Sequence, residues 1–314
     1  MSHLLPLAFS KDKSHLSEGA RGEIRALLGA RPMTFAREAI LAWAVILAAI
    51  ATATLMDSAW VSLLAMILIA TRLNVLALLV HEQVHSLGFR GRFGDLIVNL
   101  IAAYPMGTSV EGYANVHLAH HKFYFTERDP DVLRKSGPEW TFPMPASRLI
   151  GLFLRDLSGL SAVQMVRGKQ GTNGPQFKRS HPTPGWVRIA FYALLILLLS
   201  ITGSWIGFLL FWVVPLLMLF PVIVRLGAMC EHVYVRGASL TETTPLIIPR
   251  WWEKLLLPNL NFTLHSYHHF YPGIACSNLS KVHAIFEREG FIDKSHVFYG
   301  YGSYLRYLQS TLAC

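Results

Sequence analysis

Two long apolar regions constrain the fold of this chain more than any other feature of its sequence. Residues Ala39–Met56 carry no charged side chain, and residues Ala59–Val80 carry one. Residues Ile189–Val224 again carry none, and a Gly-Ser pair lies near their middle. A helix needs about 20 apolar residues to cross a hydrocarbon layer of about 30 Å. The sequence therefore predicts four membrane-spanning helices arranged as two hairpins.

Composition supports a membrane protein and orients the spans. Only 15% of the residues are charged, compared with about 25% in soluble domains. The expected outside turns, Asp57-Ser58 and Gly203-Ser204, hold no Lys or Arg, although the net charge of the chain is +9. Because cytoplasmic loops are enriched in Lys and Arg, we expect both termini to be cytoplasmic. No basic patch is interleaved with aromatic residues, so nucleic-acid binding is not expected.

The fold class predicted is an all-α integral membrane protein that forms a single domain with a cytoplasmic helical cap. Residues Asp95–Pro105 are apolar but too short to span, and we expect them to form a buried or interfacial helix. The expected order is a cytoplasmic N-terminal segment, a first hairpin, a cytoplasmic region, a second hairpin and a further cytoplasmic region, at residues 1–37, 38–80, 81–185, 186–225 and 226–314.

Three histidine clusters fall in the regions expected on the cytoplasmic side. One has the form H-E-x-x-H and two have the form H-x-x-H-H, and their members are His81, His85, His117, His120, His121, His265, His268 and His269. Residues three or four apart share one face of a helix, and imidazole is a good ligand for Zn, Fe, Cu or Ni. Eight histidines exceed the four ligands of a closed zinc site. They indicate two metals with more than four ligands each or with open positions.

This pattern resembles the membrane fatty-acid desaturase and hydroxylase superfamily. The resemblance covers roughly residues 73–286, and its motifs are His81-Glu-Gln-Val-His85, His117-Leu-Ala-His-His121 with Asp129-Pro-Asp131, and Asn261-x-x-x-His265-Ser-Tyr-His-His269. It implies that these boxes bind two irons, and that a further histidine after the last span completes the set. The matching residue is His232. Some relatives place an asparagine four residues earlier as a water-mediated contact, and Ala228 stands there in this chain.

Ligating histidines usually donate their second N–H to a carboxylate or a carbonyl. The candidate partners in this chain are Glu82, Asp129, Asp131, Glu231 and Asn261. Asp129 and Asp131 have an alternative interpretation, because the two could simply form a turn around the proline between them. His283 lies in the continuation of the last box and is expected to make a hydrogen bond rather than to bind a metal.

The resemblance implies an oxygen-dependent enzyme that introduces a C=C bond into an acyl chain, with two irons as cofactor and dioxygen as co-substrate. Its substrate would be a lipid in the membrane. The sequence has no dinucleotide fingerprint and no cysteine set for an iron–sulfur cluster. Electrons must therefore come from a separate ferredoxin or a small cytochrome with its reductase.

Other functions remain open from the sequence. The same site could insert oxygen, as hydroxylases, carotenoid ketolases and alkane monooxygenases do. The H-E-x-x-H cluster also matches the zinc-protease signature, with Glu82 as general base, although this leaves both H-x-x-H-H clusters unexplained. A metal sensor or transporter would need His or carboxylates within the spans, and the apolar segments hold none.

Overall fold

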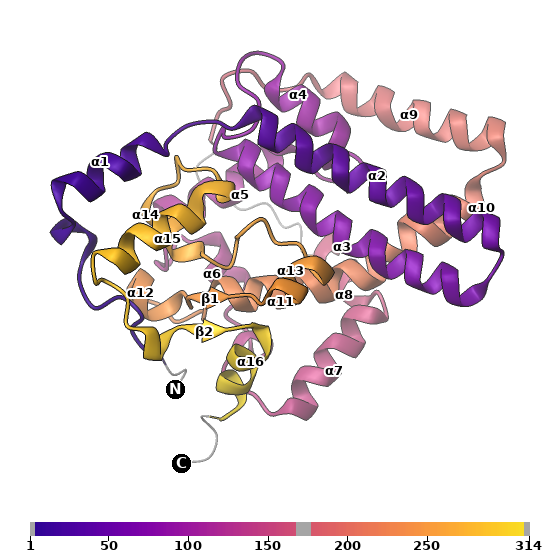
Figure 1. Cartoon of the computed structure of the whole chain (residues 1–314). Helices are drawn as coiled ribbons and strands as arrows, with labels where there is room; N and C mark the ends of the chain where they lie inside the picture. The colour runs from indigo at the N-terminus through magenta and orange to yellow at the C-terminus, as the bar shows by residue number, and fades with distance from the viewer. Residues whose placement is uncertain (1–3, 168–176, 311–314) are drawn as a thin grey trace. The chain divides into compact units, whose positions relative to one another are not determined.

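A computed structural model describes residues 4–167 and 177–310 of the chain (Figure 1). The described residues divide into two compact units, each built from separate stretches of sequence. Unit 1 contains residues 4–31, 116–152 and 226–310, and unit 2 contains residues 32–115, 153–167 and 177–225. Most residues are helical, as predicted, and β structure among the described residues consists of two strands of two residues each and a few isolated bridges. The prediction of a single domain stays a prediction.

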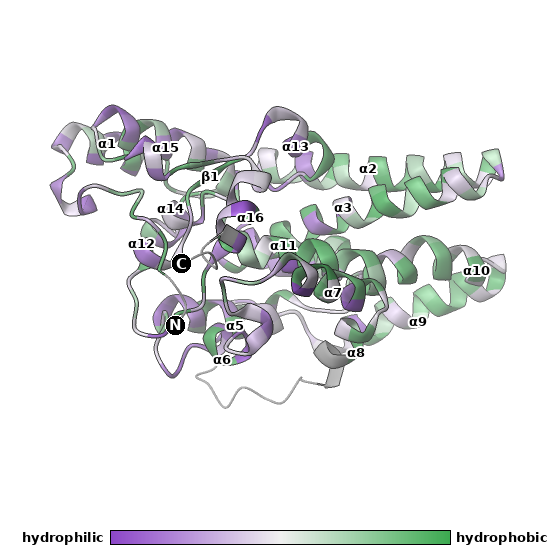
Figure 2. Ribbon diagram, turned by 90° about the horizontal axis from the view of Figure 1, so that it is seen from below, coloured by the Kyte–Doolittle hydropathy of each residue, from purple (hydrophilic) through white to green (hydrophobic). Residues whose placement is uncertain are grey.

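Four helices are long and apolar enough to cross a membrane, which confirms the predicted spans. Helices α2 (Pro32–Met56) and α3 (Ala59–Val84) form the first pair. Helix α9 (Gly185–Thr202) and the continuous helical stretch Trp205–Glu231 form the second. Figure 2 shows hydrophobic colour along most of α2, α3 and α9.

The last span is not uniform. It consists of α10 (Trp205–Phe208), the π-helical segments η4 (Leu209–Val213) and η5 (Pro215–Leu219), and α11 (Phe220–Glu231). Proline lacks the N–H that an α-helix needs at an interior position. Pro215 is the first residue of η5, and this local change of helix type accommodates its missing donor within a continuous span.

Small residues allow α2 and α3 to pack closely. The buried face of α2 contains Ala39, Ala42, Ile46, Ala49 and Ala53, which follow one another at alternating intervals of three and four residues. This spacing places one narrow seam along the helix, and small side chains at such a seam let two backbones approach each other. The remaining faces of α2 expose large apolar side chains, which suits contact with lipid tails.

The turns between the paired helices follow from single residues. Asp57 joins α2 to α3 with a positive φ of 42°, and Gly203 joins α9 to α10 with a φ of 65°. Glycine adopts this left-handed conformation without steric cost, and its N–H caps the Leu199 carbonyl at the end of α9. Both turns lie at the positions where the sequence predicts the outside connections.

The rest of unit 2 consists of shorter helices. Helix α4 (Gly94–Val98) continues into the π-helical segment η2 (Asn99–Ala103), which confirms the predicted short helix. Helix α8 (Leu160–Arg167) also lies in unit 2, whereas α5 (Val110–Lys122) and α7 (Ala146–Leu157) each belong partly to it. A buried ion pair joins Asp156 of α7 to Arg225 of α11, with two N–O distances of 2.5 and 2.9 Å.

Unit 1 is built from short helices and a two-stranded parallel sheet. Strand β1 (Ile247–Ile248) pairs with β2 (Phe298–Tyr299), and Ile247 is aligned with Phe298. The helices are α1 (Glu18–Ala26), α6 (Pro130–Arg134), α12 (Leu240–Thr243), α13 (Trp251–Leu256), α14 (His265–Phe270), α15 (Leu279–Arg288) and α16 (Tyr301–Ser310). The short 3-10 turns are η1 (Lys13–His15), η3 (Pro138–Trp140), η6 (Cys276–Asn278) and η7 (Lys294–His296).

Candidate metal centre

Four histidines from three separate parts of unit 1 converge in its interior. We call them the four-histidine group, and its members are His120, His232, His265 and His269. One ligand nitrogen from each lies within 4.8 Å of the others. The Nε2 atoms of His120 and His232 are 3.2 Å apart, and those of His265 and His269 are 3.1 Å apart. His120 and His232 lie 112 residues apart in the sequence, so only the fold brings them together.

This donor set fits a metal ion. Tetrahedral ligands at about 2.1 Å from a metal lie roughly 3.4 Å from one another, and the Nε2 separations are close to that value. The exposed fractions of His120, His232 and His265 are only 2%, 1% and 2%, and buried nitrogen atoms need partners. Burial lowers the pKa of His232 and His269 well below the usual value, with further lowering from neighbouring histidines. The neutral imidazole that results is the form that binds metals.

Asp129 orients His120 within the group. The Nδ1 atom of His120 lies 2.9 and 3.1 Å from the two carboxylate oxygens of Asp129, whose side chain is fully buried. Hydrogen bonding at Nδ1 leaves the Nε2 lone pair directed at the other histidines. Asp129 also accepts hydrogen bonds from the backbone of Phe125 and Asp131. Asp129 thus contacts a histidine and also organises the turn that begins α6.

Three hydroxyl groups hold His232 in place. Its Nδ1 lies 3.0 Å from Oγ1 of Thr244 and 3.3 Å from the Tyr124 hydroxyl. The Tyr124 hydroxyl in turn lies 2.7 Å from Oγ1 of Thr243. These three residues were not predicted as site residues. The only sequence signal is that Tyr124 follows His120 by four residues, and nothing in the sequence links either threonine to a histidine more than ten residues away.

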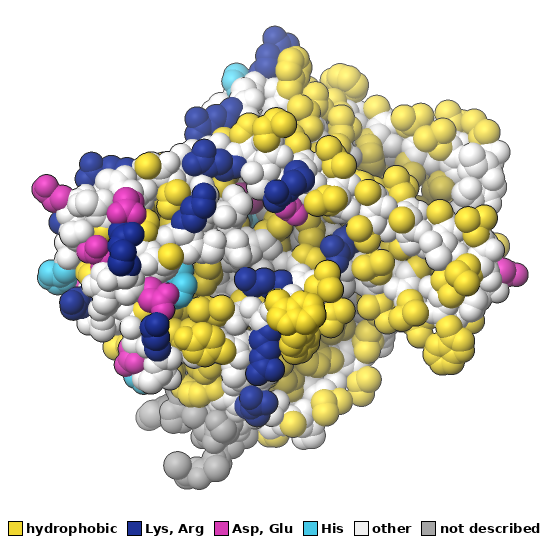
Figure 3. Space-filling view, in the orientation of Figure 1, with side chains coloured by type: hydrophobic (Ala, Val, Ile, Leu, Met, Phe, Trp, Pro, Cys, Tyr) yellow, Lys and Arg dark blue, Asp and Glu magenta, His cyan; other side chains and the backbone are white. Residues whose placement is uncertain are grey.

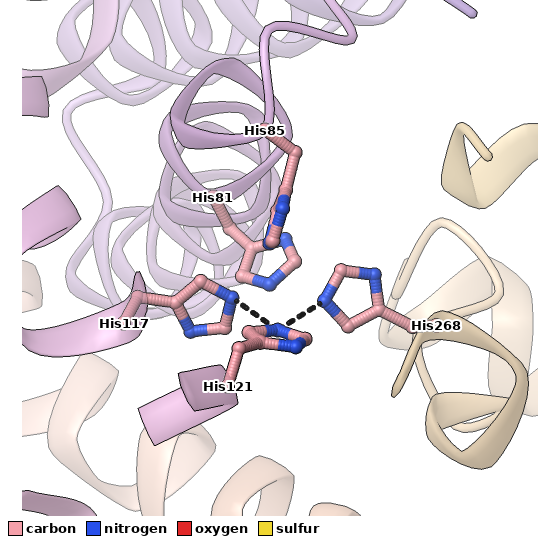
Figure 4. A group of neighbouring side chains, drawn as sticks. All are labelled: His81, His85, His117, His121 and His268. Carbon is pink, nitrogen blue, oxygen red and sulfur yellow. Dashed lines mark hydrogen bonds between the residues drawn. The ribbon is translucent and has the colours of Figure 1, made fainter. Parts of the chain in front are cut away.

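A second convergence in unit 1 involves His117, His121 and His268. The Nε2 atom of His121 lies 2.9 Å from that of His117 and 3.0 Å from that of His268. Figure 4 shows these three rings pointing toward one another, two from α5 and one from α14. His117 and His268 are buried, with exposed fractions of 6% and 0%. Helix α5 thus distributes its histidines between two groups, because the adjacent residues His120 and His121 project about 100° apart around a helix of 3.6 residues per turn.

The first cluster lies at the end of α3 in unit 2. His81 is in the last turn of the helix, and His85 is the residue that follows it (Figure 4). Their ring centroids are 5.1 Å apart, which agrees with the expectation that residues four apart share a face. Glu82, a predicted partner, is 6% exposed on the same turn. Burial and, to a smaller extent, the charge of Arg179 lower the pKa of His85 from its usual value to about 4.

Arg179 fixes the end of α3, and sequence reasoning did not predict it. Its guanidinium donates to the carbonyl oxygens of Gln83 and Val84 at 3.0 and 2.6 Å. The same group makes two bonds of 2.7 Å to the carboxylate of Asp95. The last carbonyls of a helix have no partner within the helix, so Arg179 caps α3 where the histidines stand. Arg179 lies 95 residues after Val84, and no motif marks either Arg179 or Asp95.

The remaining predicted partners contact other groups. The carboxylate of Asp131 pairs with Arg134 and, at 3.3 Å, with Lys135. Burial by itself would raise the pKa of Asp131, but these two cations hold it below its usual value. The Asn261 side chain donates to the Cys276 carbonyl at 3.3 Å, in the turn before α14. Glu231 lies at the end of α11, immediately before His232.

The segment before α1 holds α14 from the outside. Phe9 packs against Tyr267 and Phe270 with ring centroids 5.5 and 5.3 Å apart. The ammonium of Lys13 donates to the Phe270 carbonyl at 3.3 Å, at the C-terminal end of α14. Nδ1 of His283 lies 2.8 Å from the Tyr267 hydroxyl, which agrees with the hydrogen-bonding role expected for this histidine. The predicted cytoplasmic N-terminal segment thus supports a histidine-bearing helix.

Comparison with known proteins tests the resemblance seen in the motifs. A search of curated proteins finds no significant match. The model of the fatty acid desaturase family matches residues 58–303, which include all three histidine clusters and His232. This match covers well over half of the chain, and the histidine clusters that it contains include groups that could hold a metal ion. The chain therefore belongs to the fatty acid desaturase family, and it is a membrane protein and an oxidoreductase of the desaturase type.

Proposed function

We propose that this protein is an oxygen-dependent, di-iron desaturase that introduces a C=C bond into an acyl chain of a membrane lipid. Family membership supports a desaturase-type lipid oxidoreductase. The observation that carries the di-iron proposal is the four-histidine group, in which buried imidazoles converge and Asp129 orients one of them. A nitrogen-rich site of this kind suits iron.

The proposed assignment divides nine histidines between two irons. One iron would be held by the four-histidine group, His120, His232, His265 and His269. The other would be held by His81, His85, His117, His121 and His268. The convergence of His117, His121 and His268 within unit 1 supports the second set. The inclusion of His81 and His85 rests on the family's H-E-x-x-H box.

Bound iron and dioxygen would supply the oxidising power that unactivated C–H bonds require. In the overall balance, two hydrogens leave adjacent carbons of the acyl chain, and dioxygen with two further electrons and two protons becomes two waters. The protein's own groups position and shield the site. Asp129 contacts Nδ1 of His120 and so directs Nε2 toward the other histidines, and Thr244 holds the ring of His232. The rings of Phe125 and Phe262, which pack against His232 and His265, keep water away from the histidines.

The two electrons require a partner. We propose a separate ferredoxin or a small cytochrome with its reductase, which would meet the protein on the cytoplasmic side. Lys and Arg side chains are frequent on the face drawn in Figure 3, and a basic surface attracts an acidic donor. The absence of Lys and Arg from the turns at Asp57 and Gly203 supports the proposed orientation, with both termini and the histidines in the cytoplasm.

Mass spectrometry of lipids tests the reaction directly. The protein is expressed in a host that has a competent electron donor, and a His268→Ala variant serves as the inactive control. We expect acyl chains that have lost two hydrogens, in the wild-type strain alone. Chains that instead carry an added oxygen would assign the protein to the hydroxylases, and unchanged lipids would contradict both activities.

Metal analysis of the purified protein tests the cofactor. We expect about two irons per chain, because nine ligands exceed what one ion can bind. About one zinc with no iron, in protein that is active after purification, would overturn the di-iron proposal and would favour the zinc-protease interpretation of His81 and His85.

A further inference from the structure

Helix α13 buries its acidic side chain and exposes large apolar ones, which is the reverse of the usual pattern for a helix on a water-exposed surface. Its acidic residue, Glu253, points inward and is only 7% exposed. Its large apolar residues point outward: Trp251 is 78% exposed, Leu255 is 68% exposed and Leu256 is 64% exposed. A surface helix ordinarily buries its apolar face and exposes its charges. The inversion indicates that something apolar covers the outer face of α13.

Hydrogen bonds fix this orientation. The Glu253 carboxylate accepts from the backbone N–H of Arg250 at 2.7 Å and from that of Tyr301 at 3.0 Å. Gly300 lies against the same carboxylate with a φ of 89°, and a Cβ there would come within 3.0 Å of it. Turning α13 to bury its tryptophans would expel a carboxylate from two donors. The apolar side chains are therefore held outward by the fold.

Further residues extend this face into one surface. Tyr299 of β2 is 51% exposed and is aligned with Ile248, two residues before Arg250. Arg250 and Lys254 are exposed at the same helix. Figure 3 shows a cluster of hydrophobic side chains, flanked by Lys and Arg, over this part of unit 1. We call this the anchor surface, and its members are Arg250, Trp251, Trp252, Lys254, Leu255, Leu256 and Tyr299.

We propose that the anchor surface inserts into the headgroup region of a bilayer that contains anionic lipids. Tryptophan and tyrosine combine an apolar body with a polar tip, which suits the boundary between headgroups and acyl chains. Arg250 and Lys254 can reach lipid phosphates while their apolar stems lie along the surface. A second copy of the chain is a poorer occupant, because a symmetric contact would bring the same two cations against each other.

This proposal gives unit 1 a membrane contact of its own, separate from the membrane-spanning helices. Unit 1 holds the four-histidine group, so its attachment would keep a metal-binding unit at the membrane surface. The proposal does not depend on which reaction the protein catalyses, and its test needs no turnover.

Spin-label accessibility tests the proposal in single-copy nanodiscs. A label is placed at Leu255→Cys in a Cys314→Ser background, since Cys230 and Cys276 are buried. Lys281→Cys on α15 of the same unit provides the matched control, because Lys281 is exposed and lies outside the anchor surface. In discs with anionic lipid, we expect the label at residue 255 to collide more often with oxygen, which partitions into lipid, than with a water-soluble nickel chelate. The control label should show the reverse.

Two outcomes would overturn the proposal. A label at residue 255 that is as accessible to the nickel chelate as the control would show that water covers the surface. A label shielded from both quenchers would show that protein covers it.

The double variant Arg250→Gln/Lys254→Gln tests the charge component: oxygen preference should fall at least several-fold in anionic discs and change little in neutral ones. An equal oxygen preference of the variant and the parent in anionic discs would show that anionic lipid does not contribute to the contact.

Discussion

Helices α3 and α14, which both carry histidines, are stabilised by different physical means. The end of α3 in unit 2 completes a helix of 26 residues and is capped by Arg179, which also pairs with Asp95. Helix α14 in unit 1 has only six residues, too few to be stable by itself. It is held by aromatic packing against Phe9 and by the hydrogen bond from Lys13.

This difference shows how each helix comes to hold its histidines in position. A long helix positions its own side chains and needs only that its last carbonyls be satisfied. A short helix must take its position from its neighbours, and in α14 these neighbours include a segment that lies before the family match begins at residue 58. We therefore expect charge to stabilise the end of α3 and apolar packing to stabilise α14.

The largest effect should follow from removing a histidine that α14 supplies. We expect His268→Ala to abolish activity and to lower the iron content, because the proposed ligand is lost. Membrane insertion should be unchanged, since the four spans do not involve this residue. Activity assays and iron analysis of the membrane fraction provide the measurements. His15→Ala, at an exposed position, is the control, and full turnover by the His268 variant would contradict its role.

The next effect concerns the cap of α3. Replacing Arg179 by Gln leaves the buried carboxylate of Asp95 without its cation, and breaking a buried pair costs about 3–5 kcal/mol. We expect a lower thermal unfolding temperature and the loss of at most one of the two irons. Arg179→Lys keeps the charge and should retain part of the stability.

A double variant decides whether this effect comes from the ion pair. Asp95→Asn combined with Arg179→Gln removes both charges, so it should be less destabilised than the sum of the single variants. Strict additivity in thermal unfolding would show that the two residues act independently. It would contradict the claim that their ion pair stabilises the end of α3.

The packing of α14 should give an effect of similar or slightly smaller size. Phe9 is 7% exposed, and truncation of a buried Phe to Ala costs about 3 kcal/mol or more. Because α14 carries histidines of both proposed sites, we expect Phe9→Ala to lower the binding of both irons. Phe9→Leu should preserve most of the binding. Iron loss from one site only, or an unchanged iron content, would show that α14 does not depend on this contact.

The smallest effect should come from the orientation of a single imidazole. Replacing Asp129 by Asn keeps the shape of the side chain and removes the charge that stabilises His120. Partners of ligating histidines typically contribute 10–100-fold to metal affinity, so we expect weaker iron binding within that range. Competition with a chelator measures the affinity. Asp131→Asn is the matched control, because its carboxylate pairs with Lys135 and Arg134, and its iron affinity should change much less.

Much of the fold could be predicted because its signals are local. A span is determined by the length of an apolar run, so the four helices and the turns at Asp57 and Gly203 were all found from sequence. Helical spacing predicts that histidines four residues apart share a face, but it does not predict that each H-x-x-H-H cluster divides its members between two groups. His232 could be proposed only through the family resemblance, since a single histidine after a span carries no pattern.

Other features depend on contacts between distant segments. Arg179 meets the end of α3 across 95 residues, and Thr244 meets His232 across a loop and α12. Phe9 reaches α14 from the opposite end of the chain. No spacing rule connects such residues, because each contact is set by how the helices pack. Asp131 differs from these residues, because the cations that it pairs with, Arg134 and Lys135, follow it by three and four residues.

The sequence by itself determined that the chain enters a membrane, that it is mostly helical, and that it carries three clusters able to bind metals. These conclusions depend on hydrophobic length, helical period and ligand chemistry, which are properties of neighbouring residues. The tertiary structure decided which histidines converge, which groups orient them, and that α13 turns its tryptophans outward. These features arise from burial and from hydrogen bonds between segments far apart in sequence, where the energy of a contact depends on the whole fold.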